Sequence, residues 1–140
     1  MADSDPKSVV ARFWELYNTP EGITRTPELC AADCVHEQAA NLFSPAVRYV
    51  GRRAQSDRIA GVLAAFKDWN VTPHEIIAEG ERVAARYTWA ATSKVAFGGF
   101  PAGGRLRMDA SCFFTVRNGV IVNVSDIGGT IVLDDGDEHR

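Results

Sequence analysis

The acidic residues near the carboxyl-terminal end of the chain have the types and spacing that catalysis needs. Residues 105–129 predict two β-strands joined at Asn118-Gly119, a dipeptide typical of a two-residue hairpin turn. A regular turn of this kind would place Ser111 opposite Asp126. Because side chains alternate along a strand, we expect Asp109 and Asp126 to share one face. Two carboxylates would then lie close together, which suits general acid–base chemistry.

The rest of that face is expected to be apolar, with Phe113 opposite Val124. A carboxylate in such surroundings needs a polar partner or takes a raised pKa. We therefore expect the pKa of Asp126 to move toward neutrality, with Ser111 holding the side chain in place. Asp126 could instead anchor the glycine loop that follows it, and Asp109 could pair with a nearby arginine.

A short strand is predicted from Cys34 to Gln38, with His36 and Gln38 on one of its faces. If that face looks inward, the two side chains can polarise a carbonyl group. The alternative for His36 is a hydrogen-bonded structural role. His74 is expected at the surface and His139 in the tail, and the histidines show no recognised metal spacing, so we expect no metal.

Known cofactor and nucleophile motifs are missing from the sequence. It contains no Gly-x-Ser-x-Gly elbow, no phosphate loop and no dinucleotide fingerprint. The glycines within residues 97–104 lie between strands with no helix after them, which indicates a turn. We therefore expect no cofactor, and the chemistry left is acid–base work by carboxylates in an apolar pocket.

The elements that would position these residues follow from the periodicity of apolar side chains. An Asp-Pro pair starts a helix that ends after residue 17, a short helix follows over residues 26–32, and a third covers residues 56–70. The pattern then changes to strands, with a hairpin formed by residues 71–79 and 82–94. Long antiparallel strands after helices indicate an α+β fold.

The walls of the expected pocket come from the first helix, the loops and the last hairpin. Residues 39–52 and 97–104 are predicted to be irregular, and loops of that length are often functional. The candidate substrate contacts are Phe13, Trp14, Tyr17, Phe43, Trp69, Ser111, Phe113 and Val124.

Length and composition describe one ordinary globular domain. The 140 residues predict a single domain over 1–140, ending in a charged tail from about residue 134. We expect three N-terminal helices packed on one face of a curved, mainly antiparallel sheet. The last hairpin is rather apolar on both faces, so we expect a homodimer through the sheet.

Charge and cysteine content limit the partners and the compartment. The net charge of −3 gives no reason to expect nucleic acid or an anionic membrane as a partner. No apolar run approaches the ~20 residues that span a bilayer, and the first residues do not resemble a signal peptide. Three cysteines argue against a disulfide framework and favour small buried thiols in a cytoplasmic protein.

Several local strings match a known family pattern. They are Glu79-Gly80, the run from Val83 to Thr88, the loop from Gly99 to Arg105 and Asn118-Gly119. With these strings, and with the opening ARFWELYN, the chain resembles the SnoaL-like polyketide cyclase family over about residues 6–133. That family lies within the nuclear transport factor 2-like superfamily, whose fold is a cone-shaped α+β barrel.

The resemblance implies roles for several residues. Asp126 falls where limonene-type epoxide hydrolases keep a catalytic aspartate, and Gln38 where they have an asparagine. His36 falls where those hydrolases have a water-orienting tyrosine. The chain departs from the pattern at Thr88 and Ala90, where the hydrolases keep an arginine and a second aspartate.

Phe13 replaces the oxyanion tyrosine of ketosteroid isomerases, which argues against isomerase activity of that type. The last strand reads Val124-Ser125 where family members commonly have His-Trp. The superfamily includes cyclases, isomerases, hydrolases and non-enzymes, so the resemblance is specific for fold rather than activity.

Three hypotheses of function follow. The first is a cofactor-free cyclase, or related lyase or isomerase, acting on a hydrophobic polyketide-like carbonyl compound. In it Asp126 moves the proton while His36 and Gln38 donate hydrogen bonds to the enolate oxygen. The second is epoxide hydrolysis by water that Asp126 activates. The third is a non-catalytic module that binds a hydrophobic small molecule.

Overall fold

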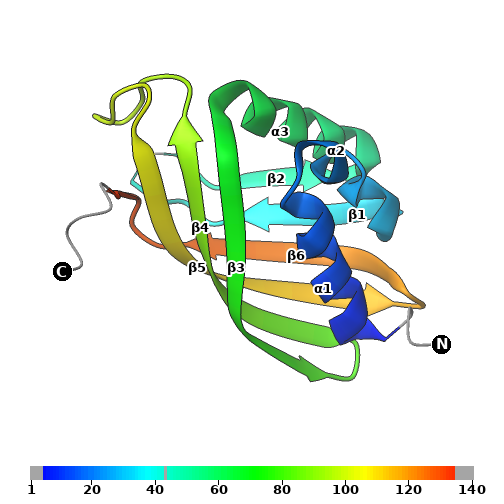
Figure 1. Ribbon diagram of the computed structural model, residues 1–140. Coiled ribbons are helices and arrows are strands. Elements are labelled where there is room, and N and C mark those ends of the chain that lie inside the picture. Colours follow the sequence, from blue (N-terminus) through cyan, green and yellow to red (C-terminus); the bar gives the residue numbers. More distant parts are fainter. Residues whose placement is uncertain (1–4, 43, 135–140) are drawn as a thin grey trace.

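The computed structural model describes residues 5–42 and 44–134, in which helices pack on one side of a curved sheet (Figure 1). The helical elements are α1 (Pro6–Tyr17), α2 (Pro20–Ile23), a 3₁₀ turn (Thr26–Leu29) and α3 (Gly51–Ala65). The strands are β1 (Cys30–Gln38), β2 (Val47–Val50), β3 (Phe66–Glu79), β4 (Arg82–Ser93), β5 (Arg105–Arg117), β6 (Val120–Gly128) and β7 (Val132–Leu133). The predicted α+β class is confirmed.

The sheet has the strand order β2-β1-β6-β5-β4-β3, and β7 pairs with β5. Among the described strands, β1 and β6 run parallel and the other pairs are antiparallel. A parallel pair cannot be joined by a tight turn. Here the connection is the whole stretch from β2 through β5. The first strand and the last long strand therefore become neighbours only when the fold closes.

Helix α1 begins where its sequence predicts. Asp5 accepts a hydrogen bond from the Ser8 backbone N–H (3.2 Å), and Pro6 occupies the first turn, where no N–H is needed. After the helix, the Asn18 amide donates to the Val71 carbonyl (2.9 Å) and accepts from the Val71 N–H (2.7 Å). The carboxyl-terminal end of α1 is thereby attached to β3.

The predicted boundaries of the third helix were wrong by several residues. The helix starts at Gly51 rather than near residue 56, and β3 starts at Phe66, so Trp69 lies in a strand. Gly51 has φ of +90°, a left-handed conformation that glycine adopts without strain. The chain can therefore turn directly from β2 into α3.

Two other segments also differ from the prediction. The helix expected over residues 26–32 is a 3₁₀ turn that ends at Leu29, because β1 already begins at Cys30. Residues 39–52, expected to be irregular, contain β2 and the start of α3. Local patterns are weak in such short elements, which are fixed by their pairing partners in the sheet.

The last hairpin turns at Asn118-Gly119, as the sequence predicts. Both residues have positive φ, 53° and 80°, as a type I′ turn requires. The first pairs after the turn, Arg117 with Val120 and Val116 with Ile121, follow the expected register.

Beyond these pairs the predicted register was wrong. Val122 is an extra residue on β6, a β-bulge that shifts every later pair by one position. Asp126 consequently pairs with Cys112 instead of Ser111. Because paired residues share a face, this one-residue shift decides which side chains of β5 accompany Asp126.

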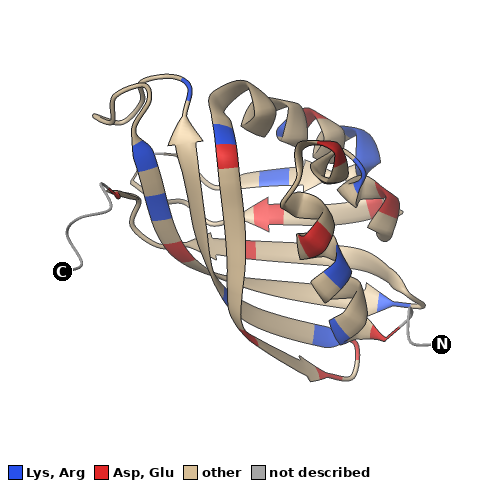
Figure 2. Ribbon diagram, viewed as in Figure 1, with Lys and Arg blue, Asp and Glu red and all other residues tan. Residues whose placement is uncertain are grey.

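Charged side chains of both signs are spread over the helices and the strands (Figure 2). No helix in the described part of the chain has the length and apolar character needed to cross a membrane. Of the charged tail expected from residue 134, residues 135–140 lie outside the described residues.

Candidate active site

A cavity of about 420 Å³ lies between the helices and the facing side of the sheet, a volume typical of small-molecule sites. Its apolar walls come from α1, α3 and the inward positions of the strands. The polar side chains that line it are Tyr17, His36, Gln38, Asn41, Ser44, Arg58, Tyr87 and Asp126. Asp126 is the one carboxylate among the described residues of the lining.

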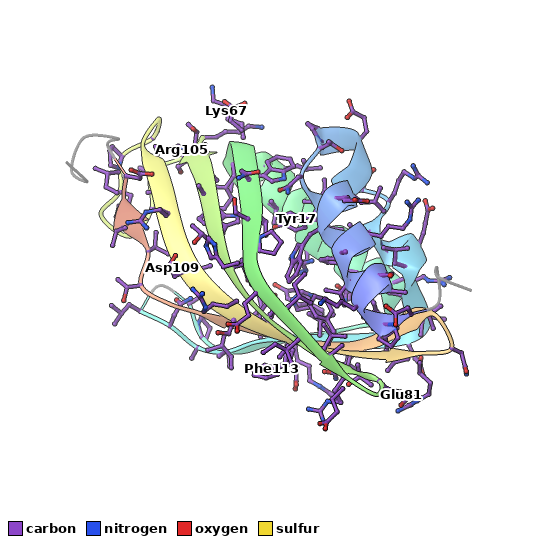
Figure 3. All side chains as sticks on the ribbon, turned by 60° about the horizontal axis from the view of Figure 1, so that its bottom comes forward. Tyr17, Lys67, Glu81, Arg105, Asp109 and Phe113 are labelled. Atoms are coloured by element: carbon purple, nitrogen blue, oxygen red, sulfur yellow. The ribbon has the colours of Figure 1, made fainter. Side chains whose placement is uncertain are left out.

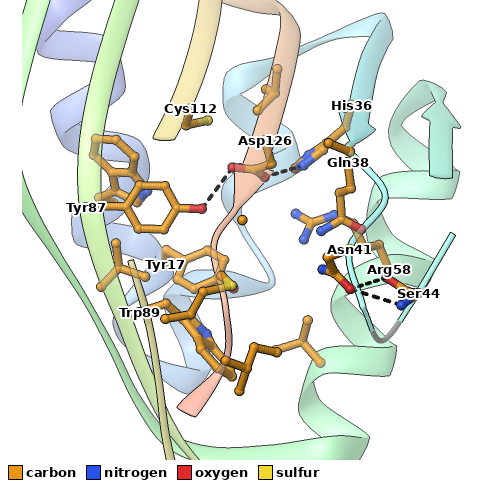
Figure 4. A pocket seen from close by; sticks show the side chains of 18 of the residues that line it. Tyr17, His36, Gln38, Asn41, Ser44, Arg58, Tyr87, Trp89, Cys112 and Asp126 are labelled. Atoms are coloured by element: carbon orange, nitrogen blue, oxygen red, sulfur yellow. Dashed lines mark hydrogen bonds and ion pairs between the residues drawn. The ribbon is translucent and has the colours of Figure 1, made fainter. Parts of the chain in front are cut away.

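Both oxygens of the Asp126 carboxylate have hydrogen-bond partners. His36 Nε2 lies 2.7 Å from Oδ2, and the Tyr87 hydroxyl donates to Oδ1 over 2.9 Å (Figure 4). The three side chains come from β6, β1 and β4, so none of these contacts is local in sequence. The Asp126 side chain is 19% exposed and that of His36 only 4%, so the carboxylate is the group that a ligand in the cavity can reach.

The electrostatic surroundings favour the ionised form of Asp126. Burial raises the pKa of its carboxyl, but the hydrogen bond and charge of His36, hydrogen bonding by Cys112 and the charge of Arg58 outweigh burial. The pKa therefore lies below its ordinary value, and the predicted raised pKa was wrong. Hydrogen bonds to a charged group contribute about 1.5–3 kcal/mol each, enough to hold a buried carboxylate ionised.

The pairing of β1 with β6 brings the predicted polar residues of β1 to the same cavity. Gln38 is the register partner of Asp126, and His36 is the partner of Val124. All four residues line the cavity, so the face of β1 that carries His36 and Gln38, whose direction the sequence left open, looks inward. His36 Nε2 is directed at Asp126, however, so this atom supports the carboxylate and is not free for a substrate oxygen.

Asp109 does not join Asp126. The bulge at Val122 puts Asp109, Ser111 and Phe113 on the outer face of the sheet, away from the cavity. Asp109 and Phe113 are labelled in Figure 3. Asp109 is exposed and accepts a hydrogen bond from the Thr88 hydroxyl (2.7 Å). The predicted shared face of two carboxylates was therefore wrong, and Ser111 and Phe113 do not line the cavity.

The other predicted wall residues divide into those that reach the cavity and those that do not. Phe13, Trp14, Tyr17 and Val124 line it, and Figure 3 shows Tyr17 between α1 and the sheet. Trp69 does not line the cavity; its indole Nε1 donates to the Tyr17 carbonyl over 2.6 Å. It fixes the end of α1 instead. The candidate Phe43 lies outside the described residues.

Two functional candidates, Tyr87 and Arg58, were missed by reasoning from the sequence. On β4 the odd-numbered positions are buried and the even-numbered ones are not, which puts Tyr87 and Trp89 on the cavity side. Thr88, at the position compared above with an epoxide hydrolase arginine, points outward. Arg58 could have been found as a charged residue within the apolar stripe of α3, one turn before Val62.

Comparison with known proteins identifies relatives of this fold. A family model described as a SnoaL-like domain matches residues 10–124. IdmH, a candidate polyketide cyclase from Streptomyces antibioticus, shares 26% identity with a TM-score of 0.72, over 89% of this chain and 91% of that one. No curated protein matches the chain significantly.

Two further solved structures share the fold at lower identity. SalBIII, an epoxide hydrolase/cyclase-like enzyme of pyran ring formation in salinomycin, is 19% identical with a TM-score of 0.76, over 91% of this chain and 95% of that one. An LEH-like epoxide hydrolase from M. tuberculosis is 19% identical with a TM-score of 0.68, over 89% and 82%.

Proposed function

The chain belongs to the SnoaL-like domain family, and from this premise we propose that it is a cofactor-free acid–base enzyme of the polyketide cyclase type. Its substrate is a hydrophobic compound that carries carbonyl groups. The reaction is an intramolecular aldol-type ring closure or a related isomerase or lyase step. The observation that carries this proposal is the Asp126 carboxylate, which is hydrogen-bonded to His36 and Tyr87 at the wall of an apolar cavity.

In the proposed mechanism Asp126 removes a proton from the carbon next to a substrate carbonyl. The electron pair of the broken C–H bond moves into the carbonyl, which becomes an enolate. The enolate carbon then attacks a second carbonyl of the same molecule, a new C–C bond forms, and the alkoxide takes the proton back from Asp126. Protons and electrons balance without an added reagent.

The neighbours of Asp126 have two roles in this mechanism, which are to orient the carboxylate and to stabilise the enolate. His36 and Tyr87 are positioning residues, because they hydrogen-bond the carboxylate and fix its orientation. Gln38, beside Asp126 in the β1–β6 ladder, can donate its amide N–H to the enolate oxygen. The apolar walls exclude water, which strengthens each of these interactions.

Proton abstraction can be measured without the natural substrate. We expect the enzyme to accelerate deuterium exchange at the α-carbon of 2-tetralone, a bicyclic hydrophobic ketone, in D₂O, as followed by proton NMR. Asp126→Asn should lower the enzyme-catalysed rate by about 10²-fold or more, because the amide cannot accept the proton.

The second acid of the hairpin is the matched control. Asp109→Asn alters an exposed carboxylate on the outer face and should leave exchange unchanged. An Asp126→Asn variant that folds like the wild type and exchanges equally fast would refute the mechanism. No enzyme-dependent exchange with any hydrophobic ketone would favour the binding-module alternative.

Epoxide hydrolysis is the second candidate, because Gln38 and Asp126 lie side by side and could hold a water molecule between them. Hydrolysis of a cyclic epoxide in ¹⁸O-labelled water would place the label in the diol product, whereas ring closure would not. The β4 residues that line the cavity are Tyr87 and Trp89, so this strand contributes no second carboxylate to activate water.

We also propose that two copies associate through the outer face of the sheet. Ile77, Phe113 and Ile127 are 58%, 42% and 47% exposed on that face. The charged side chains there include the Arg86–Glu75 and Arg48–Glu37 pairs, in which opposite charges are balanced. A balanced, partly apolar surface can meet a second copy of itself across a twofold axis.

A further inference from the structure

Arg58 lies at the wall of the cavity and has no acidic partner among the described residues. It projects from α3, and Figure 4 shows its guanidinium directed into the cavity. Its Nε is buried and has no hydrogen-bond partner among the described residues. A buried N–H that is left unpaired is costly, so this atom is suited to an acceptor that a ligand supplies.

Within the described ranges, no residue of the protein supplies an acceptor for Arg58 Nε or a carboxylate that pairs with its charge. No described carboxylate forms a salt bridge with Arg58, whereas four other arginines each pair with a glutamate. The charge of Arg58 lowers the pKa of Asp126, but the two oxygens of this carboxylate are hydrogen-bonded to His36 and Tyr87. Burial raises the pKa of Tyr17, while the charge and hydrogen bonding of Arg58 oppose this rise, but a neutral phenol cannot balance a positive charge.

The combination of features is specific to this position. Arg107 also has a buried Nε without a partner in the described part of the chain, but Arg107 does not line the cavity. Arg52 lies six residues before Arg58 on α3 and donates to the Cys30 carbonyl through two nitrogens, at 2.8 and 3.0 Å. Among the described residues, Arg58 is the arginine that both lines the cavity and keeps an unpaired buried N–H.

We propose that Arg58 binds a carboxylate of the substrate, so that the substrate is a hydrophobic keto acid; this inference rests on the proposed function. Guanidinium is a planar fork that matches the two oxygens of a carboxylate. The apolar walls, among them Trp14, Trp89 and Phe114, would contact the hydrocarbon part. With the carboxylate at α3, the substrate would be oriented so that its reactive carbon lies at Asp126 on β6.

Binding of a matched pair of probes tests this specificity. The probes are 2-naphthoate and 2-naphthamide, which have nearly the same shape and differ in charge. By isothermal titration calorimetry at neutral pH we expect the wild type to bind the naphthoate at least about tenfold more tightly. The protein has a net charge of −3, so a general attraction for anions cannot produce this preference.

Variants of Arg58 locate the preference. Arg58→Gln should abolish it while leaving binding of the naphthamide within about twofold, and Arg58→Lys should restore part of it through charge alone. Arg53→Gln, which removes an exposed arginine of the same helix, should behave as the wild type. Circular dichroism of each variant checks that the fold is retained.

The outcomes separate this inference from the catalytic proposal. Equal binding of both probes by the wild type, or an undiminished preference in Arg58→Gln, would overturn the assignment. If Arg58→Gln fails to fold, the wild-type preference and the Arg58→Lys variant still decide the question. Asp126→Asn should keep the carboxylate preference, so failure of proton abstraction at Asp126 would leave this result standing.

Discussion

Asp126, the proposed base, lies in an electrostatic setting that favours its charged form. A carboxylate with a lowered pKa is ready to accept a proton over a wide pH range, but it is an intrinsically weak base. Exclusion of water and hydrogen bonding to the enolate must therefore lower the barrier to proton transfer. In the proposed mechanism the hydrogen-bond donors are therefore needed together with the aspartate.

The pH dependence of the exchange rate should change when hydrogen bonds to Asp126 are removed. Its active form is the carboxylate, so the exchange rate falls as the pH falls through the pKa of this group. His36→Phe removes its strongest stabilising partner, which raises that pKa and moves the acid limb to higher pH. Tyr87→Phe, which removes a single hydrogen bond, should shift the limb in the same direction.

The measurement is the rate of 2-tetralone exchange as a function of pH. Tyr49→Phe serves as the control, because it preserves the aromatic ring that contacts His36, at 6.2 Å between centroids, and removes only the hydroxyl. An acid limb that stays in place in His36→Phe would show that His36 does not act through Asp126.

At the scale of elements, the position of α1 depends on its attachment to β3. The Asn18 amide makes two hydrogen bonds to the backbone of Val71, and the Trp69 indole binds the Tyr17 carbonyl. These contacts hold the end of the helix whose aromatic side chains form one wall of the cavity. The attachment makes no contact with the cavity through Asn18 or Trp69, but it holds the helix that shapes one wall.

Asn18→Ala tests this attachment. The substitution leaves the N–H and carbonyl of Val71 without their partners, and we expect the free energy of unfolding to fall by about 1–3 kcal/mol. Urea denaturation monitored by tryptophan fluorescence measures the change. Asn70→Ala, at an exposed position of the same strand, should change stability by no more than about 0.5 kcal/mol. Equal stability of the two variants would contradict the attachment.

At the scale of the whole molecule, the two faces of the sheet differ in what covers them. The inner face carries the cavity, while the outer face exposes apolar side chains around Phe113. Water contact with these side chains is unfavourable, and pairing of two copies would remove it. The bulge at Val122 contributes to this arrangement, because it places Phe113 outside and Asp126 inside.

Phe113→Glu should convert a dimer into a monomer. Two buried glutamates facing each other across a twofold interface would repel, and their desolvation is costly. Light scattering coupled to size-exclusion chromatography measures the mass, with Val95→Glu, at an exposed loop position away from the sheet, as the control. A wild type that is monomeric at micromolar concentration would contradict the proposed association.

Local sequence patterns determined much of the fold and part of the site. The cap at Asp5, the apolar stripe of α1 and the turn at Asn118-Gly119 depend on residues close together in the chain, so their conformations could be predicted. Alternation along β1 likewise placed His36 and Gln38 on one face. These features require no knowledge of distant partners.

The tertiary structure alone decided the composition of the site. A bulge of one residue reversed the face of every later side chain relative to β5, so Asp126 gained Cys112 as a neighbour and lost Asp109. The parallel pairing of β1 with β6 brought His36 to Asp126 across 90 residues, and Tyr87 and Arg58 reached the same cavity from other elements. Strand periodicity gives the alternation of side chains, but pairing between distant strands decides which face becomes the cavity.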